Sequence, residues 1–351
     1  MKGVVLAGGK GSRLRPFTYS GAKQLVPIAN TPVLHFPVRQ LVDAGITEIA
    51  LVVGDTENQI REAMGDGSAF GARFTYVRQE APLGIAHGAL VCREFVGAES
   101  FVLYLGDNVL QGGIEAFVER FGAEAPLASV ILREVTDPRA FGVAEMRGER
   151  LERVVEKPDT PPSNLAVIGV YAFSPAVFEV IARQTPSARG ELEIADAING
   201  LLALGMVTVT ETDAFWIDTG KMEDILAANR VMLDALPMGC APSAVLSHTA
   251  IRGAVEIGPG AVLEGCTVRG PVSIGPGALL TNSVIGPHVS IGPGCELRSV
   301  TIENSIVMER TVIERSPGIR HSMIGRYAFV SGAPNGARLT LGVHSRFEAN
   351  S

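Results

Sequence analysis

The sequence predicts an α/β domain followed by a parallel β-solenoid. Before about residue 237, short β-rich segments alternate with segments in which apolar residues repeat at helical spacing. After about residue 251 the helical period disappears, and aliphatic residues recur at a spacing near six. Glycine is also abundant, at 40 of 351 residues, whereas an average protein has about 7%.

The first domain is expected to hold a mostly parallel sheet covered by helices on both faces. Candidate strands, each a short β-rich run that ends in polar or glycine residues, are 4–7, 48–53, 74–77, 101–105 and 129–132. Between them, apolar residues share one helical face at positions 34, 38, 41 and 42, and again at 85, 89, 92 and 96. Strand–helix alternation favours parallel strands, and ligands then bind beyond their carboxyl ends.

A last helix over 222–236 is expected to close this domain, so that 1–236 is one unit and 237–250, beginning Pro237-Met238-Gly239, is a linker. In 251–351 the sequence IGPG occurs three times. A six-residue period places one aliphatic side chain per short strand inside a solenoid, with glycine or polar residues at the corners. The inward positions are expected to be Ile257, Val262, Val268, Ile274, Leu280, Ile285, Ile291 and Leu297. A β-sandwich would instead show strict alternation of apolar and polar residues.

Composition excludes several classes of protein. A net charge of −7 argues against general nucleic-acid binding. Basic residues nevertheless dominate the start of the chain, where six Lys or Arg precede the first acid, Asp43; this favours a small polyanionic ligand. The four cysteines form no CxxC pair, which suits a reducing compartment. No apolar run approaches the roughly 18 residues of a membrane helix. We therefore expect a cytoplasmic protein without nucleic-acid or membrane partners.

The strongest local signal is LAGGKGSRLRP at 6–16, directly after the first strand. Its glycines allow backbone N–H groups to approach a bound phosphate, and arginine binds phosphate with two hydrogen bonds. No GxxxxGK[ST] sequence is present, which excludes the Walker loop. The dinucleotide pattern GxGxxG also fails, because Leu14 stands where the third glycine would be.

Seven segments together resemble the sugar-1-phosphate nucleotidylyltransferases. They are LAGGKGSRLRP at 6–16, KQLVPI at 23–28, QEAPLG at 79–84, LGDN at 105–108, EKP at 156–158, RGELE at 189–193 and WIDTG at 216–220. Within the family, the resemblance is greatest to members that use dTTP and glucose-1-phosphate and carry a hexapeptide-repeat tail. It implies a Rossmann-like mixed sheet followed by a left-handed parallel β-helix. Three departures are Phe141 for a frequent Tyr, Ser12 for a frequent Thr, and His87 for a frequent Gln.

The resemblance also implies roles for individual residues. The expected nucleotide-binding residues are Leu6, Ala7, Gly8, Gly9, Gly11, Ser12, Arg13, Gln24, Gln79, Pro82, Gly84 and Asp107. The expected sugar-phosphate residues are Asn108, Gly142, Glu156, Lys157, Val167 and Tyr171. The expected catalytic residues are Arg13, Lys23, Asp107, Lys157 and Asp218. In the family, the lysine matching Lys23 contacts the triphosphate and the one matching Lys157 binds the sugar phosphate.

These residue types fit nucleotidyl transfer. Both substrates are anions, so catalysis depends on neutralising and aligning charge. Asp107 and Asp218 each end a strand-like segment, and two carboxylates meeting there would suit Mg²⁺. Gln79 offers both a donor and an acceptor to the imide edge of thymine or uracil. A strand-ending Asp can also cap a helix, a role we expect for Asp55, and His87 can be an ordinary helical residue.

Several alternatives remain open at this stage. The same chemistry could use UTP, GTP or ATP, or another sugar phosphate. The tail could add acyl transfer with His288 or His321 as the base. A non-catalytic regulatory subunit would be expected to lack Arg13, Lys23 or Asp107, all of which are present. Because the ends of a solenoid are open, we expect a homo-oligomer with contacts from the tail.

Overall fold

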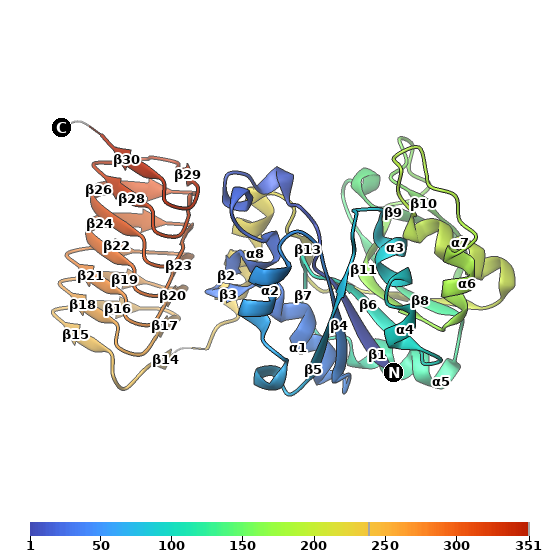
Figure 1. The fold of residues 1–351 in the computed structure, drawn as a ribbon. Coiled ribbons are helices and arrows are strands. Elements are labelled where there is room, and N and C mark those ends of the chain that lie inside the picture. Colours follow the sequence, from blue (N-terminus) through green and yellow to red (C-terminus); the bar gives the residue numbers. More distant parts are fainter. Residues whose placement is uncertain (238, 350–351) are drawn as a thin grey trace. The chain divides into compact units, whose positions relative to one another are not determined.

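The computed structural model describes residues 1–237 and 239–349, and its chain forms two compact units (Figure 1). The first unit combines Met1–Lys10 with Leu34–Asp218, and the second combines Gly11–Val33 with the chain from Thr219 onward. The expected division at residue 236 is therefore wrong in one respect. The segment after the glycine-rich loop folds with the C-terminal strands and with the helix expected over 222–236.

The first unit is built on a nine-stranded mixed sheet in the order β10-β9-β11-β6-β1-β4-β5, with β8 and β12 joined through β11. Its strands are β1 (Lys2–Leu6), β4 (Glu48–Val53), β5 (Arg73–Arg78), β6 (Phe101–Leu105), β8 (Ala128–Glu134), β9 (Gly142–Arg147), β10 (Arg150–Glu156), β11 (Leu165–Phe173) and β12 (Val207–Glu211). A separate antiparallel pair joins β7 (Asn108–Leu110) to β13 (Trp216–Asp218).

Four of the five predicted strands, now β1, β4, β5 and β6, are parallel. The fifth, β8, pairs antiparallel with β11, so the expectation of a mostly parallel sheet is wrong beyond β6. The physical reason is that β8, β9, β10 and β11 follow one another without the long helical crossovers that parallel pairing needs. The mixed sheet implied by the family resemblance is confirmed.

Seven helices belong to the described part of this unit, and the side chains between them and the sheet form its apolar core. They are α1 (His35–Asp43), α2 (Glu57–Met64), α3 (Ile85–Leu90), α4 (Arg93–Val96), α5 (Glu115–Glu124), α6 (Ala176–Ile181) and α7 (Ile194–Leu204), with short 3-10 turns at Ser68–Phe70 and Pro138–Ala140. The helix expected over 85–96 is two helices, because the Cys92 N–H donates to the Ala89 carbonyl and tightens the chain there.

The second unit contains the predicted left-handed parallel β-helix, whose short strands stack in three columns (Figure 1). One column is β14 (Gly239–Cys240), β17 (Val255–Ile257), β20 (Val272–Ile274), β23 (Val289–Ile291), β25 (Ser305–Val307), β27 (Met323–Ile324) and β29 (Thr340–Leu341). The next is β15 (Val245–Ser247), β18 (Val262–Glu264), β21 (Leu279–Thr281), β24 (Glu296–Glu303), β26 (Val312–Arg320), β28 (Phe329–Ser331) and β30 (Arg346–Glu348). The third is β16 (Ala250–Arg252), β19 (Thr267–Arg269) and β22 (Val284–Ile285), continued by the later halves of β24 and β26.

Pairing in the β-helix repeats every 17 residues over most of its length, as in Ile257 to Ile274 to Ile291. One turn of the helix thus contains two steps of six residues and one of five. Seven of the eight expected inward aliphatics are buried, but Val262 is partly exposed and Leu263 is fully buried in its place. A strict six-residue count misses this shift of one residue. Positions such as His248, Gly265 and Asn282 recur at the same corner with positive φ, a conformation that glycine and asparagine tolerate well.

The β-helix begins before residue 251, which corrects the expected linker over 237–250. Strands β14 and β15 lie in that range and pair with β17 and β18 as a first turn. Apolar period alone misses this turn because its residues are exposed: Val245 is 55% exposed and Leu246 is 42% exposed. Of the expected linker sequence Pro237-Met238-Gly239, Met238 lies outside the described residues.

The remaining elements of the second unit connect the glycine-rich loop to the β-helix. They are the 3-10 turns Ser12–Leu14, Phe17–Tyr19 and Lys23–Leu25, the hairpin β2 (Pro27–Ile28) and β3 (Thr31–Pro32), and helix α8 (Met222–Asp234). At the hairpin turn, Asn30 Nδ2 donates to Ser273 Oγ at 2.9 Å and to the Ile291 carbonyl at 3.0 Å. These contacts explain why residues 11–33 fold with the tail.

Candidate active site

The carboxyl ends of β1, β4 and β6 meet at a glycine-lined edge of the sheet. The Ala7 N–H donates to the Val52 carbonyl at 2.7 Å, and the Gly106 N–H donates to the Leu6 carbonyl at 2.9 Å. A Cβ on Gly106 would lie 2.7 Å from that same carbonyl oxygen, a distance that excludes any side chain. Gly54 packs less tightly on Gly8, since a Cβ on Gly54 would lie 3.1 Å from the Gly8 carbonyl oxygen. Glycine is therefore required here for the backbones to approach one another, and the edge stays open to a ligand.

Lys10 lies beside this edge and forms an ion pair of 3.5 Å with Asp55. Both side chains are more than half exposed, so water screens the pair and it contributes little stability. The expected capping role of Asp55 is wrong, since Thr56 occupies the N-cap position of α2 and no side chain caps that helix.

In the second unit, the loop continues through Gly11, whose φ of +61° lies in the left-handed region. A Cβ there would lie 2.8 Å from the Cβ of Lys23, so Gly11 and Lys23 are in close contact. Thr18 Oγ1 holds the turn by donating to the Gly11 carbonyl at 2.7 Å. Arg13 and Ser12 are exposed. Thus the predicted phosphate-binding residues Gly11, Ser12, Arg13 and Lys23 share one small loop structure.

Gln24 lies in the same loop but is only 1% exposed. Within the described residues its Oε1 accepts no hydrogen bond, and an unpaired buried amide oxygen is costly. The prediction that Gln24 contacts the nucleotide remains untested by this geometry.

The predicted base-reading segment sits at the end of β5. Gln79 Nε2 donates to the Gly84 carbonyl at 3.2 Å and lies 3.0 Å from His87 Nδ1. Gly84 has a φ of +102°, and a Cβ there would lie 2.5 Å from the Leu192 carbonyl oxygen. The backbone of Leu192 in turn bonds Leu83 and Ala86. The base-reading segment is therefore fastened to the RGELE segment, while Pro82 is exposed at its tip.

Asp107 and Asp218 come together through the pairing of β7 with β13. Asp218 lies opposite Asn108 in this antiparallel register, next to Asp107 in the chain. Asn108 is 1% exposed, and its side-chain amide contacts both Asp107 and β13. Its Nδ2 donates to Asp107 Oδ1 at 3.1 Å, and its Oδ1 accepts from Trp216 Nε1 of β13 at 2.7 Å. Of the two carboxylates predicted to share a cation, Asp218 thus ends β13 and Asp107 lies directly before the neighbouring strand β7.

Three of the predicted sugar-phosphate residues lie side by side on β9, β10 and β11, while Tyr171 is further along β11, Lys157 follows β10 and Asn108 begins β7. Gly142 pairs with Glu156 on one side and with Val167 on the other. A Cβ on Gly142 would lie 3.4 Å from Glu156 Oε2, so glycine keeps space above the sheet at this point. Burial raises the pKa of Tyr171 well above its usual value, and the negative charge of Glu156 raises it further. Tyr171 therefore stays a neutral hydroxyl.

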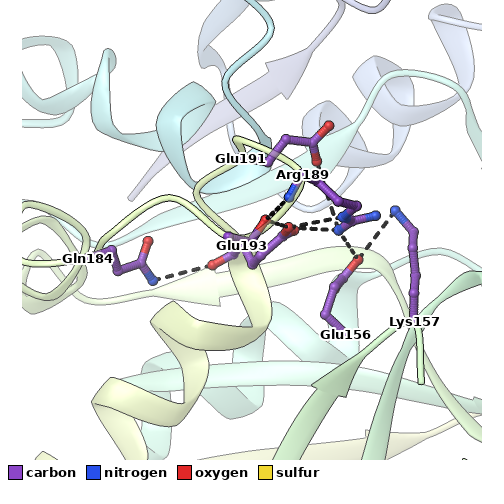
Figure 2. A network of polar contacts seen from close by, with 7 residues as sticks. Glu156, Lys157, Gln184, Arg189, Glu191 and Glu193 are labelled. Carbon is purple, nitrogen blue, oxygen red and sulfur yellow. Dashed lines mark hydrogen bonds and ion pairs between the residues drawn. The ribbon is translucent and has the colours of Figure 1, made fainter. Parts of the chain in front are cut away.

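Figure 2 shows the polar network around Lys157. Lys157 Nζ lies 3.4 Å from Glu156 Oε1, and Arg189 Nη2 lies 3.2 Å from the same oxygen. Arg189 is also anchored by Glu193, at 2.7 Å, whose side chain is 8% exposed. Burial lowers the pKa of Arg189, but its pairing with Glu193 and Glu156 outweighs this effect and raises it overall. Two cations are thus held at one carboxylate oxygen.

Three further residues, which the sequence did not single out as site residues, belong to this arrangement. Arg189 and Trp216 lie within segments that were recognised, but the segments alone do not show which side chain points at Glu156 or at Asn108. For His87, the family resemblance indicated a position near the base pocket, and an ordinary helical residue was the alternative; its contact is with Gln79.

The histidines considered for acyl transfer in the tail lie at corners of the β-helix. His288 Nε2 is 3.0 Å from Asp234 Oδ1 of α8, and His321 is exposed. Within the described residues, no group of three or more His, Cys, Asp or Glu lies close enough to hold a metal ion by itself. Across that same part of the chain, no helix is both long and apolar enough to cross a membrane.

Comparison with known proteins places the chain in a family. The model of the family described as nucleotidyl transferase matches residues 2–235. The chain belongs to the nucleotidyl transferase family. The match covers every motif from the glycine-rich loop to Asp218 and ends at the helix α8.

Curated relatives extend this similarity over the tail. The chain is 46% identical to the low-salt glycan biosynthesis nucleotidyltransferase Agl11 of Haloferax volcanii, over 99% of this chain and all of that protein. It is 43% identical to the glucose-1-phosphate thymidylyltransferase of Streptomyces griseus, over the full length of both. Among solved structures, a Bacillus anthracis protein assigned as a glucose-1-phosphate thymidylyltransferase and bound to sucrose is 38% identical. It superposes with a TM-score of 0.64 over 68% of this chain and 97% of that one.

Proposed function

We propose that this nucleotidyl transferase transfers a thymidylyl group from dTTP to glucose-1-phosphate, giving dTDP-glucose and pyrophosphate. The observation that carries the proposal is the position of Asn108. Its side chain contacts Asp107, its backbone pairs with Asp218, and a Cβ on Gly169 of β11 would lie 2.6 Å from its Oδ1. The carboxylates and the sugar-phosphate strands therefore meet at one residue.

The sugar phosphate would bind at Lys157 and Arg189. Both cations already contact Glu156 Oε1, so their charges are close enough for one phosphate group to reach both. Lys157 has a φ of +42°, an uncommon value for a residue with a side chain. Its N–H donates to the Phe141 carbonyl at 2.9 Å, which holds this conformation. The sugar hydroxyls would contact Asn108, Glu156 and Tyr171 above the space kept by Gly142 and Val167.

The triphosphate would bind along the glycine-rich loop. Backbone N–H groups of Gly8, Gly9, Gly11 and Ser12 suit phosphate oxygens, and Arg13 and Lys23 add positive charge. The base would contact Gln79 and the backbone of Gly84, with Leu6, Ala7 and Pro82 beside it and Gln24 near the sugar or phosphate. Exposure of Arg13 and part-exposure of Lys23 leave both side chains accessible to a substrate.

The reaction needs no protein nucleophile. A phosphate oxygen of glucose-1-phosphate attacks the α-phosphorus of dTTP, a new P–O bond forms, and the bond to the leaving pyrophosphate breaks. The attacking oxygen carries no proton at neutral pH, so no general base is required. Lys157 and Arg189 would hold the nucleophile, and Arg13 and Lys23 would offset the charge that develops on the leaving group.

Asp107 and Asp218 would hold a divalent cation, which we expect to be Mg²⁺. The donor set fits this ion, because Mg²⁺ in nucleotide enzymes is bound by one or two carboxylates and completes its shell with phosphate oxygens and water. When bound, the ion would neutralise phosphate charge and polarise the α-phosphate. Asn108 Nδ2 would orient Asp107 by its hydrogen bond to Oδ1.

The choice of dTTP and glucose-1-phosphate rests on the relatives that carry these substrates in their names. UTP is the nearest alternative, because thymine and uracil share the imide edge that Gln79 can read and differ by one methyl group. We also propose a homo-oligomer with contacts from the start of the β-helix, where Val245, Leu246 and Leu279 are each more than 40% exposed. Light scattering on the full chain would test this.

Pyrophosphate release tests the function directly. The full chain would be incubated with glucose-1-phosphate and Mg²⁺ and with dTTP, UTP, ATP or GTP in turn. We expect the highest kcat/KM with dTTP and formation of dTDP-glucose. Preference for another triphosphate would replace the base assignment, and absence of turnover with every sugar-1-phosphate offered would overturn the proposal.

A further inference from the structure

We propose that His87 is a positioning residue that fixes the side-chain amide of Gln79 with Oε1 presented to the nucleotide base. The inference rests on the proposed function, since it deepens the account of how that site selects its base. Its basis is the geometry of three groups: the Gln79 amide, the Gly84 carbonyl and the His87 imidazole.

The orientation of the Gln79 amide is determined by the Gly84 carbonyl. Gln79 Nε2 lies 3.2 Å from this oxygen. A backbone carbonyl is only an acceptor, so the group facing it must be the NH₂ and cannot be the amide oxygen. Gly84 is held in turn by its contact with the Leu192 backbone, so the acceptor has a fixed position.

The second hydrogen of the Gln79 NH₂ is directed to His87. His87 Nδ1 lies 3.0 Å from Gln79 Nε2, and a nitrogen that faces an NH₂ group must accept. His87 is therefore neutral, with its proton on Nε2. Burial lowers the pKa of His87, which is consistent with a neutral ring. Helix α3 provides the rigid support for the imidazole. Gly84 is the N-cap residue of this helix, and His87 lies in the first turn.

Both hydrogens of the Gln79 amide are thus used inside the protein. Among the described residues, no hydrogen bond to Gln79 Oε1 is seen, so the carbonyl oxygen is the polar atom left for a ligand. An oxygen acceptor matches the N3–H of thymine or uracil. Cytosine presents an unprotonated N3 at that place, and two acceptors facing each other repel. His87 would therefore favour imide bases over cytosine without touching the base itself.

The test compares two variants of the full chain. His87→Leu removes the acceptor, whereas His87→Asn can place its Oδ1 near the position of Nδ1. Without its second partner the Gln79 amide rotates more freely. Since a neutral hydrogen bond contributes about 0.5–1.5 kcal/mol, the ratio of kcat/KM for dTTP over dCTP should fall about three- to tenfold in His87→Leu. The KM for glucose-1-phosphate should stay within about twofold, and His87→Asn should recover most of the ratio.

The two failures are distinguishable. If the unaltered enzyme uses neither dTTP nor UTP, the proposed function is wrong; if it prefers UTP, the UTP over CTP ratio is measured instead. If it uses dTTP but a folded His87→Leu keeps the same ratio, or His87→Asn loses as much, the positioning role is overturned. Nitrogen-15 NMR of the unaltered protein with dTTP decides the matter even where a variant fails to fold. We expect an unprotonated Nδ1 at His87, and a protonated Nδ1 would refute the inference.

Discussion

Replacing Asn229 should destabilise the second unit, because this side chain joins three of its elements. Asn229 lies on α8 and is 1% exposed. Its Oδ1 accepts from the Ala29 N–H of the β2–β3 turn at 2.8 Å and from Ser290 Oγ of β23 at 2.7 Å. Both donors are buried, Ala29 at 7% and Ser290 at 0% exposure.

The cost follows from these two donors. In Asn229→Ala, the Ala29 N–H and the Ser290 hydroxyl lose their acceptor in a place that bulk water does not reach. A buried polar group left unpaired costs about 1–3 kcal/mol. The hydroxyl can rotate toward another acceptor, whereas the backbone N–H cannot, so we expect a total loss of about 2–4 kcal/mol.

A double-mutant cycle measures this coupling. Urea unfolding would be followed for the unaltered chain, Asn229→Ala, Ser290→Ala and the double variant. Ser290→Ala alone should cost about 1 kcal/mol, since Oδ1 keeps the Ala29 N–H. The double variant should be less destabilised than the sum of the two by about 1 kcal/mol, because the hydrogen bond between the two side chains can be lost only once. Strict additivity, or a loss below about 1 kcal/mol for Asn229→Ala, would refute the reasoning.

Three further outcomes are expected. Asp107→Asn should lower kcat by about a hundredfold or more without changing the melting temperature, and EDTA should abolish turnover, since charge neutralisation would be lost; a fully active, folded variant would contradict this. Lys157→Ala should raise the KM for glucose-1-phosphate more than the KM for dTTP, and Lys23→Ala should do the reverse. Equal effects on both KM values would contradict the proposal that Lys157 binds the sugar phosphate and Lys23 the triphosphate. Burial, aided by the charge of Arg39, lowers the pKa of His35 from 6.5 to about 4. Between pH 6.5 and pH 4, His35 is therefore protonated in the unfolded chain but neutral in the folded chain. Stability should therefore fall as the pH drops from 6.5 towards 4, by about 1 kcal/mol at pH 5 after allowance for partial exposure, and calorimetry should show a smaller loss in His35→Leu.

Much of the fold could be predicted because its signals are local. The β-rich runs at 48–53 and 101–105 coincide with β4 and β6, since each is a short apolar segment with glycine directly after it. The β-helix was recognisable from its aliphatic period. The six-residue period wrongly predicted that Val262 points inward. A turn of 17 residues must contain one five-residue step, and sequence spacing does not show at which corner this shorter step lies.

The sequence motifs predict which residues form the site, but they do not predict the contacts among those residues. Glycine at 84 and 142 was predicted to belong to the site, yet the need for glycine at each comes from a backbone or side chain distant in sequence, such as Leu192 for Gly84. His87 and Arg189 show the same limitation. Their roles depend on which group lies 3 Å away from one ring nitrogen or one guanidinium, and periodicity carries no information about such contacts.

The placement of residues 11–33 changes how the tail should be regarded. The tail was expected to serve assembly, since every catalytic motif lies before residue 221. In the structure, the hairpin turn at Asn30 donates to Ser273 and to the Ile291 carbonyl, and Arg326 donates to the Leu25 carbonyl at 3.4 Å. The loop bearing Arg13 and Lys23 is continuous with these anchored residues. Removing the β-helix would therefore remove both acceptors of the Asn30 side chain and release the hairpin turn. Support for the predicted phosphate-binding loop is thus a role of the tail in addition to its proposed part in assembly. A truncation that lowers nucleotide affinity would then not imply that the tail takes part in the chemistry.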